Sequence, residues 1–161
     1  MNWSARGRRG RRPPKEGKRP WTFDDVEECC YREEIELVVV PMKQPGFFRH
    51  YDGRPTIVLS SLLRGIKKTF VGLHELGHYF SDTPETALYM PDSSSKREYA
   101  ANRFAVCQMI PERMMLRMVA QRTLWALEEE LGYEPSDFGS KLLEMRLQVY
   151  ARSPILNWSC E

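Results

Sequence analysis

The chain has 161 residues, of which 42% are hydrophobic and 29% are charged, a composition typical of a globular protein with one domain. Its apolar runs are too short to span a membrane, and its basic N-terminus lacks the apolar stretch of a signal peptide. We therefore expect a cytoplasmic protein. Its four cysteines are expected to be reduced thiols, because nothing in the sequence indicates a secretory context.

The first twenty residues differ from the rest of the chain in charge. They contain eight Arg or Lys and one Glu, a net charge of +7, whereas the remaining residues carry −5. Such a segment cannot bury a core, so we expect a disordered basic arm over residues 1–20, a domain over 21–152 and a tail over 153–161. The arm could hold DNA phosphates, whereas a solvated tail is the simpler alternative. The arginines concerned are Arg6, Arg8, Arg9, Arg11 and Arg12.

A helix and a small sheet are predicted next. Residues 23–34 show helical spacing of apolar residues, with Thr22 as a candidate N-cap. The β-branched run from Ile35 to Val40 predicts a buried strand, with partners near residues 46–51 and 56–59. An edge strand can pair with an extended substrate backbone, and residues 56–59 are the candidate for that role.

The segment His74-Glu75-Leu76-Gly77-His78 carries the most informative spacing in the chain. Apolar residues at helical spacing up to Phe80, after a candidate cap at residues 60–61, predict that it lies on a helix. Histidines four positions apart lie about 40° apart on one helix face, so both imidazoles can bind one zinc ion. Glu75 lies about 100° from His74, where its carboxylate can act as general base on a metal-bound water. Manganese, iron or cobalt would suit such ligands as well.

A catalytic zinc site requires three protein ligands and one open position, so a third ligand is needed. One candidate is His50, which lies in a segment predicted to be extended or looped. The other is Glu98, near the start of a second predicted helix, on the same face as Asn102, which could support a ligand histidine. Ser95 and Glu98 also form a capping-box pattern, in which Glu98 would satisfy backbone donors instead. Spacing alone does not separate these two roles of Glu98.

The remaining segments are predicted to be mainly helical. Residues 80–96 form a long polar connection, either a mobile flap or a surface loop. A methionine-rich helix follows Pro111 as far as about Arg122, and we interpret its methionines as core rather than as a substrate groove. Two further helices are expected over 124–131 and 138–150. Candidate donors to a developing oxyanion are Tyr79, Tyr89, Tyr99, Arg97 and Arg103.

Two motifs of the chain belong together. The first is the segment 74–78, and the second reads Glu98-Tyr99-Ala100-Ala101-Asn102-Arg103-Phe104-Ala105, followed by an apolar run that ends at Pro111. Together they resemble the ImmA/IrrE family of metallopeptidases. The second matches the family pattern E-x-x-A-N-x-F-A without gaps, with Gln108 where the family usually carries leucine. A looser match covers about residues 21–152. The resemblance implies that Glu98 is the third ligand, that Glu75 is the general base and that each chain binds one zinc ion.

The sequence thus predicts an α+β fold with a small zincin-type, gluzincin-like domain. A short, mainly antiparallel sheet should pack on the helix of the HExxH motif, and a helical C-terminal region should follow. The leading hypothesis is a zinc-dependent endopeptidase. Its implied substrate is a helix-turn-helix repressor, because family members encoded by phages, mobile elements and bacteria act on such proteins. The alternative is a metal-stabilised binding protein that inactivates a regulator by contact. The intact Glu75 argues against it, since a structural site closes its fourth position.

Overall fold

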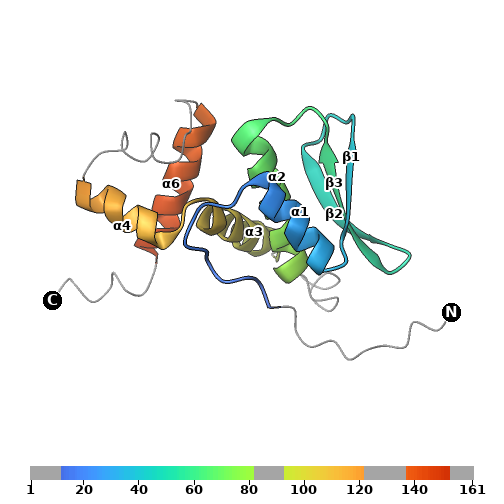
Figure 1. Ribbon diagram of the computed structural model, residues 1–161, viewed down its shortest axis with the longest axis horizontal. Coiled ribbons are helices and arrows are strands. Elements are labelled where there is room, and N and C mark those ends of the chain that lie inside the picture. The colour runs from blue at the N-terminus through green and yellow to red at the C-terminus, as the bar shows by residue number, and fades with distance from the viewer. Residues whose placement is uncertain (1–11, 82–92, 122–136, 153–161) are drawn as a thin grey trace.

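Eight helices and strands lie within the part of the chain that the computed structural model describes, which is residues 12–81, 93–121 and 137–152 (Figure 1). They are α1 (Phe23–Arg32), β1 (Glu36–Val40), β2 (Gly46–Tyr51), β3 (Arg54–Ser60), α2 (Gly65–Ser81), α3 (Ser93–Met109), α4 (Glu112–Gln121) and α6 (Asp137–Ala151). The helix expected over 124–131 and most of the connection over 80–96 lie outside the described residues. None of the described helices is both long and apolar enough to span a bilayer.

The three strands form a mixed sheet in the order β1-β3-β2. β1 pairs with β3 in parallel, whereas β2 pairs with β3 antiparallel. The α+β class and the small sheet are confirmed, but only one of the two strand pairings is antiparallel. A two-residue turn at Asp52 and Gly53 joins β2 to β3, and both residues have a positive φ, at 49° and 79°. This is the backbone of a type I′ hairpin turn, which glycine adopts readily.

Two expectations about the strands are wrong. β3 lies at the centre of the sheet, so residues 56–59 have neighbouring strands on both edges and cannot pair with a substrate. β1 lies at an edge of the sheet and is not a buried strand, because none of its residues is fully buried and Val39 is 46% exposed. Its β-branched composition therefore reflects strand propensity rather than burial on two faces.

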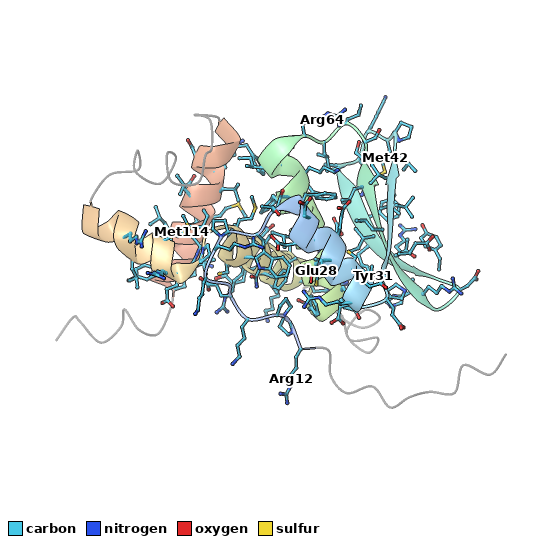
Figure 2. All side chains as sticks on the ribbon, viewed as in Figure 1. Arg12, Glu28, Tyr31, Met42, Arg64 and Met114 are labelled. Atoms are coloured by element: carbon cyan, nitrogen blue, oxygen red, sulfur yellow. The ribbon has the colours of Figure 1, made fainter. Side chains whose placement is uncertain are left out.

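Helices α1 and α2 cover one face of the sheet, and α2 carries the segment 74–78 in its second half (Figure 1). α2 begins at Gly65, later than a cap at residues 60–61 predicts, because Ser60 ends β3 instead of capping the helix. The Ser60 hydroxyl donates to the Met42 carbonyl oxygen at 2.6 Å and accepts from the Leu62 N–H at 3.3 Å. Met42 lies in the loop between β1 and β2, and Arg64 lies in the loop between β3 and α2. Figure 2 shows both residues at the same end of the sheet.

Helix α3 approaches α2 closely at a glycine. A Cβ added at Gly77 would lie 2.7 Å from the Cα of Ala101 and 3.0 Å from its carbonyl oxygen. Those are backbone atoms of a packed helix, so they cannot move aside as a flexible side chain would. Gly77 therefore permits the close helix crossing that places Glu98, three residues before Ala101, beside the histidines of α2.

The core joins the sheet to the helices. Ile57 and Leu59 of β3 are fully buried in one cluster with residues of α2, α3, α4 and α6. Met114 and Met115 of α4 belong to this cluster, which confirms that these methionines are core. The largest fully buried side chains contributed by the described helices are Val26, Leu73, Leu76, Val106, Met109, Met115 and Leu142.

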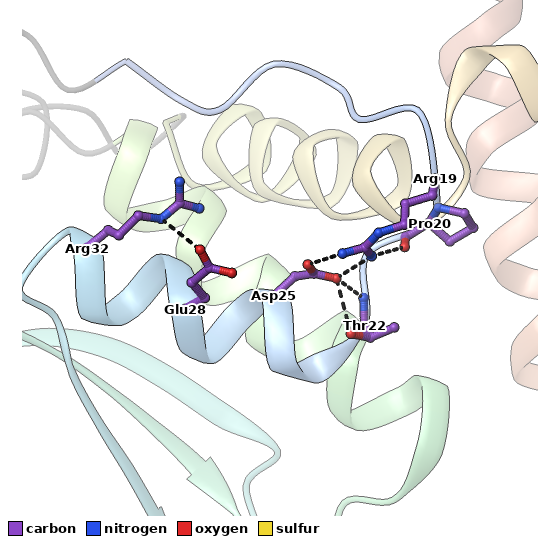
Figure 3. Close-up of polar contacts among 6 residues, drawn as sticks. All are labelled: Arg19, Pro20, Thr22, Asp25, Glu28 and Arg32. Carbon is purple, nitrogen blue, oxygen red and sulfur yellow. Dashed lines mark hydrogen bonds and ion pairs between the residues drawn. The ribbon is translucent and has the colours of Figure 1, made fainter.

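Asp25 fixes the start of α1 (Figure 3). Its carboxylate accepts the backbone N–H of Thr22 at 2.7 Å and two guanidinium N–H groups of Arg19 at 2.7 and 2.8 Å. These bonds to Arg19 lower the pKa of Asp25 to about 2. The predicted helix with Thr22 at its N-cap is confirmed, and Asp25 supplies the reciprocal half of a capping box.

Part of the basic arm is held against the domain. The Trp21 N–H donates to the backbone oxygen of Gln108 at 3.0 Å, and the Gln108 side-chain amide donates to the backbone oxygen of Pro14 at 3.1 Å. Gln108 is buried, and its two hydrogen bonds anchor the segment before α1 to the domain. The boundary at residue 20 stays a prediction, but the described contacts of this segment begin at Pro14. Residues 1–11, which include Arg6, Arg8, Arg9 and Arg11, lie outside the described residues.

Removal of the Glu16 carboxylate should destabilise the fold. It accepts hydrogen bonds from the Glu112 backbone N–H and, at 3.1 Å, from Arg146, which is only 3% exposed. Without Glu16, the buried guanidinium keeps its bond to the Ile110 oxygen at 2.7 Å but loses its counter-charge. We expect Glu16→Ala to lower the free energy of unfolding by about 2 kcal/mol. This loss is smaller than that for an ion pair with both partners buried, because the Glu16 side chain is partly exposed. Urea denaturation measures this, with Lys15→Ala as control, and equal stabilities would show that the pair contributes nothing.

Candidate metal centre

Three side chains meet between α2 and α3. The Nε2 atoms of His74 and His78 are 3.1 Å apart, and the Glu98 carboxylate oxygens lie 3.3 Å from the first and 3.2 Å from the second. Within the described part of the chain, these three form the only group of at least three potential ligand side chains that converge. The structure thus brings together the three residues predicted as metal ligands, here called the metal-donor group.

The geometry of the metal-donor group suits a divalent ion. Ligand atoms of a tetrahedral zinc site lie about 3.3 Å from one another, because the bonds are about 2.0 to 2.1 Å long. His74 Nδ1 lies 2.8 Å from the Asn102 side-chain oxygen, which can only accept. The ring N–H is therefore assigned to Nδ1, and in the neutral imidazole Nε2 then carries a lone pair. That lone pair faces the Glu98 carboxylate, an arrangement that becomes attractive when a cation lies between them.

The other roles considered for these positions are not seen. Helix α3 begins at Ser93, so Ser95 lies inside the helix and not at its N-cap position. His50 is exposed on β2, and its ring packs edge-on against Phe48 with centroids 5.1 Å apart. It is not part of the metal-donor group.

Asn102 lies within hydrogen-bond distance of His74, and if it supports this histidine as a metal ligand, its removal should weaken metal binding. The Nδ1–H bond to Asn102 orients the imidazole and raises its basicity, and loss of such a partner typically lowers metal affinity about 10- to 100-fold. We expect this loss in Asn102→Leu and a much smaller change in Asn102→Asp, which keeps an oxygen acceptor. Zinc titration against a chromophoric chelator measures both. Equal affinities of Asn102→Leu and wild type would contradict the supporting role.

Glu75 lies beside the metal-donor group without belonging to it. It is 6% exposed, and burial raises the pKa of its carboxyl to about 7, with a further upward contribution from the charge of Glu98. The backbone N–H of Phe48 in β2 donates a hydrogen bond to the Glu75 carboxylate, and this bond lowers the pKa. A carboxyl group that titrates near neutrality both accepts and returns protons readily. The contact with Phe48 was not predicted, because no local pattern indicates which strand lies behind the motif helix.

The raised pKa of Glu75 makes the stability of the metal-free protein depend on pH. Because the folded-state pKa lies above the usual 4.5, the carboxyl favours the folded state below about pH 4.5, and this contribution is lost as pH rises through 7. The neutral variant Glu75→Gln should therefore be more stable than wild type at pH 8 by about 2–3 kcal/mol, and similar to it at pH 4.5. Denaturant titrations of both proteins in chelator test this. A stability difference that does not change with pH would contradict it.

The site is open on the side of α3. The histidine rings are largely covered, whereas the Glu98 side chain is 56% exposed. On α2, the Phe70 ring lies 6.1 Å from the His74 ring between centroids, and Phe138 of α6 packs edge-on against Phe70 at 5.5 Å. Phe70 precedes His74 by four residues, so helical spacing indicates this neighbour, but the contribution of α6 comes from the tertiary fold.

Two of the candidate oxyanion donors have contacts with residues outside the metal-donor group. The Tyr79 hydroxyl donates to the Glu33 carboxylate at 3.1 Å, and the Tyr99 ring lies 5.4 Å from the Arg152 guanidinium. Tyr89 lies outside the described residues. Arg97 and Arg103 stay predictions.

The cysteines in the described ranges serve packing rather than metal binding. Cys29 and Cys30 are buried and unpaired, and burial raises the pKa of their thiols to about 11 and about 12. Burial also raises the pKa of Cys107. Thiols with raised pKa values stay protonated at neutral pH and are poor ligands and nucleophiles. Cys160 lies outside the described residues.

Comparison with known proteins assigns the chain to a family. Among curated proteins, no match to the chain was found. The sequence model of a peptidase family, described as the IrrE N-terminal-like domain, matches residues 33–132. That range is more than half of the chain, and it contains the three strands, the metal-donor group and Glu75. The chain therefore belongs to the Peptidase_M78 family of IrrE N-terminal-like domains.

Proposed function

We propose that this protein is a zinc-dependent endopeptidase that cleaves a helix-turn-helix transcriptional repressor. Its family membership indicates a metallopeptidase-type function. The observation that carries the proposal further is the position of Glu75, a buried carboxyl with a pKa of about 7 beside a convergent metal-donor group that it does not join. A purely structural metal site has no use for such a group.

In this proposal His74, His78 and Glu98 hold the metal. When bound in such a site, zinc supplies a Lewis acid that polarises a carbonyl group and acidifies water. The Glu75 carboxylate removes a proton from the attacking water, holds it on one carboxyl oxygen, and then returns it to the nitrogen of the leaving amine. Asn102 keeps the His74 ring in the tautomer whose Nε2 faces the metal-donor group.

The outer edge of β2 offers a docking place for an extended substrate. The two-residue turn makes Tyr51 and Arg54 a hydrogen-bonded pair, so every second residue of β2, counting back from Tyr51, turns its N–H and C=O groups toward β3. The residues between them, Gly46, Phe48 and His50, direct theirs to the outer edge. The Phe48 N–H reaches Glu75, so this edge runs beside the proposed base. A substrate strand paired antiparallel to β2 would pass Glu75.

The repressor as substrate rests on the family resemblance, and a comparison of protein N-termini tests it together with cleavage. Native host cells would express wild type or Glu75→Gln at matched levels, with the zinc content of both proteins verified. We expect a new N-terminus in a DNA-binding regulator with wild type alone. Identical termini in both strains, with both proteins folded and zinc-loaded, would favour inactivation of a regulator by contact.

A further inference from the structure

A basic pocket lies at the end of the sheet where the β1–β2 loop meets the start of α2. It has a volume of about 340 Å³, and its charged lining residues are Lys43, Arg64 and Lys67, with no carboxylate in its wall. All three cations are exposed, and none of them forms an ion pair with a carboxylate of the described residues. The pocket therefore concentrates positive charge that no described group neutralises.

The pocket is built on fixed backbone. The Arg64 guanidinium donates to the carbonyl oxygens of Ser61 and Leu63, the latter at 2.8 Å, and so lies against its own loop. The Ser60 hydroxyl joins this loop to the Met42 carbonyl oxygen in the loop that carries Lys43. The first turn of α2 adds the partial positive charge of a helix N-terminus. Arg64 and the loop backbone are therefore held in place before an anionic group binds, so that little of their conformational entropy is lost on binding.

The pocket lies at the end of α2 and β2 that precedes the metal-donor group in the chain direction of α2. Lys67 precedes His74 by seven positions, so the two side chains project within about 20° of each other on one face of α2, about 10 Å apart along its axis. β2 advances along α2 in the same direction, since Gly46 contacts Val71 and Phe48 contacts Glu75. Lys67 lies one helical turn before Val71, and Pro45 lies one residue before Gly46. Both line the pocket.

We propose that this pocket binds an acidic side chain of the protein substrate, three or four residues C-terminal to the cleaved bond. The inference rests on the proposed function and names its specificity. Glu75 and Lys67 are about 12 Å apart along α2, the length of three to four residues of an extended chain. A substrate antiparallel to β2 runs from the Tyr51 end toward Gly46, so the pocket lies on its C-terminal side. Three cations around one pocket match a single carboxylate better than the spaced phosphates of a nucleic acid.

The test is a cleavage profile of the zinc-loaded full chain on a proteome-derived peptide library. Wild type should prefer Asp or Glu at the third or fourth position after the cleaved bond. For matched peptides with Glu or Gln there, Lys67→Gln should reduce the ratio of the two kcat/KM values about fivefold, as expected for an exposed ion pair. The matched control is Lys68→Gln, because Lys68 faces α1, where its Nζ lies 3.8 Å from the centre of the Phe23 ring. It should keep the preference of wild type.

A second measurement separates failure of this inference from failure of the proposed function. An acidic decapeptide and its amide counterpart would be titrated against zinc-loaded Glu75→Gln, with and without Lys67→Gln, by fluorescence anisotropy. If the acidic peptide binds more tightly than its amide counterpart and this difference depends on Lys67, the proposed pocket is supported even if no library peptide is cleaved. The absence of cleavage would then count against the proposed peptidase function alone. Three results would overturn the inference about the pocket. They are cleavage without a preference for acidic residues, an unchanged preference in Lys67→Gln, and a Lys67-dependent affinity for a DNA duplex in place of the acidic peptide.

Discussion

Glu75→Gln should lower the rate of peptide cleavage about 1000-fold while the protein keeps its fold and its zinc. The amide cannot accept a proton from water, and removal of a general acid–base group typically costs about 10²- to 10⁴-fold in rate. Zinc should stay bound because Glu75 does not belong to the metal-donor group. The measurement is kcat/KM for a peptide that wild type cleaves, together with the zinc content of both proteins.

The matched control for this variant is Glu36→Gln, the same change at an exposed position of β1. It should cleave at the wild-type rate. If Glu75→Gln kept activity within a few-fold of wild type, the proton would have to be transferred by another group and the proposed mechanism would be wrong.

Glu98→Ala should lose metal affinity by more than 100-fold. The carboxylate lies 3.3 and 3.2 Å from the two imidazole nitrogens, and without it only two ligand side chains remain. This loss should exceed the 10- to 100-fold effect that removal of a supporting partner such as Asn102 produces. The Glu98 side chain is largely exposed, so the fold should tolerate its removal. Competition with a chelator measures the affinity, and thermal denaturation checks the fold.

Glu144→Ala, a change at an exposed glutamate of α6, is the control for Glu98→Ala and should bind zinc as wild type does. Full metal affinity in Glu98→Ala would show that Glu98 is not a ligand. His50→Ala would then be examined next, although the structure places His50 on the exposed part of β2.

The local features of this protein could be predicted from its sequence because each depends on residues close together in the chain. Helical periodicity predicted the helix around His74, and Thr22 predicted the start of α1. The pairing of Glu98 with the histidines was ambiguous from spacing alone and was indicated by the family resemblance. The structure brings these residues together through the α2–α3 crossing at Gly77, a contact that depends on tertiary packing.

The order of the strands could not be predicted, because a run of valines in β1 suits an edge strand as well as a central one. That order places residues 56–59 in the central strand, so the substrate-pairing role that the sequence suggested for them is proposed for the edge strand β2 instead. The ion pair between Glu16 and Arg146 could not be predicted either. Its partners lie 130 positions apart, and the sequence of the arm indicates only charge and flexibility.

The rate of peptide cleavage as zinc is added back to the metal-free protein tests the central claim most directly. One zinc ion per chain, held by His74, His78 and Glu98, predicts no cleavage in chelator and a rate that rises in proportion to added zinc up to one equivalent. Glu75→Gln should bind the same equivalent and stay inactive. Cleavage by the metal-free protein, or a fully zinc-loaded and folded wild type that cleaves no peptide or protein offered to it, would contradict the account.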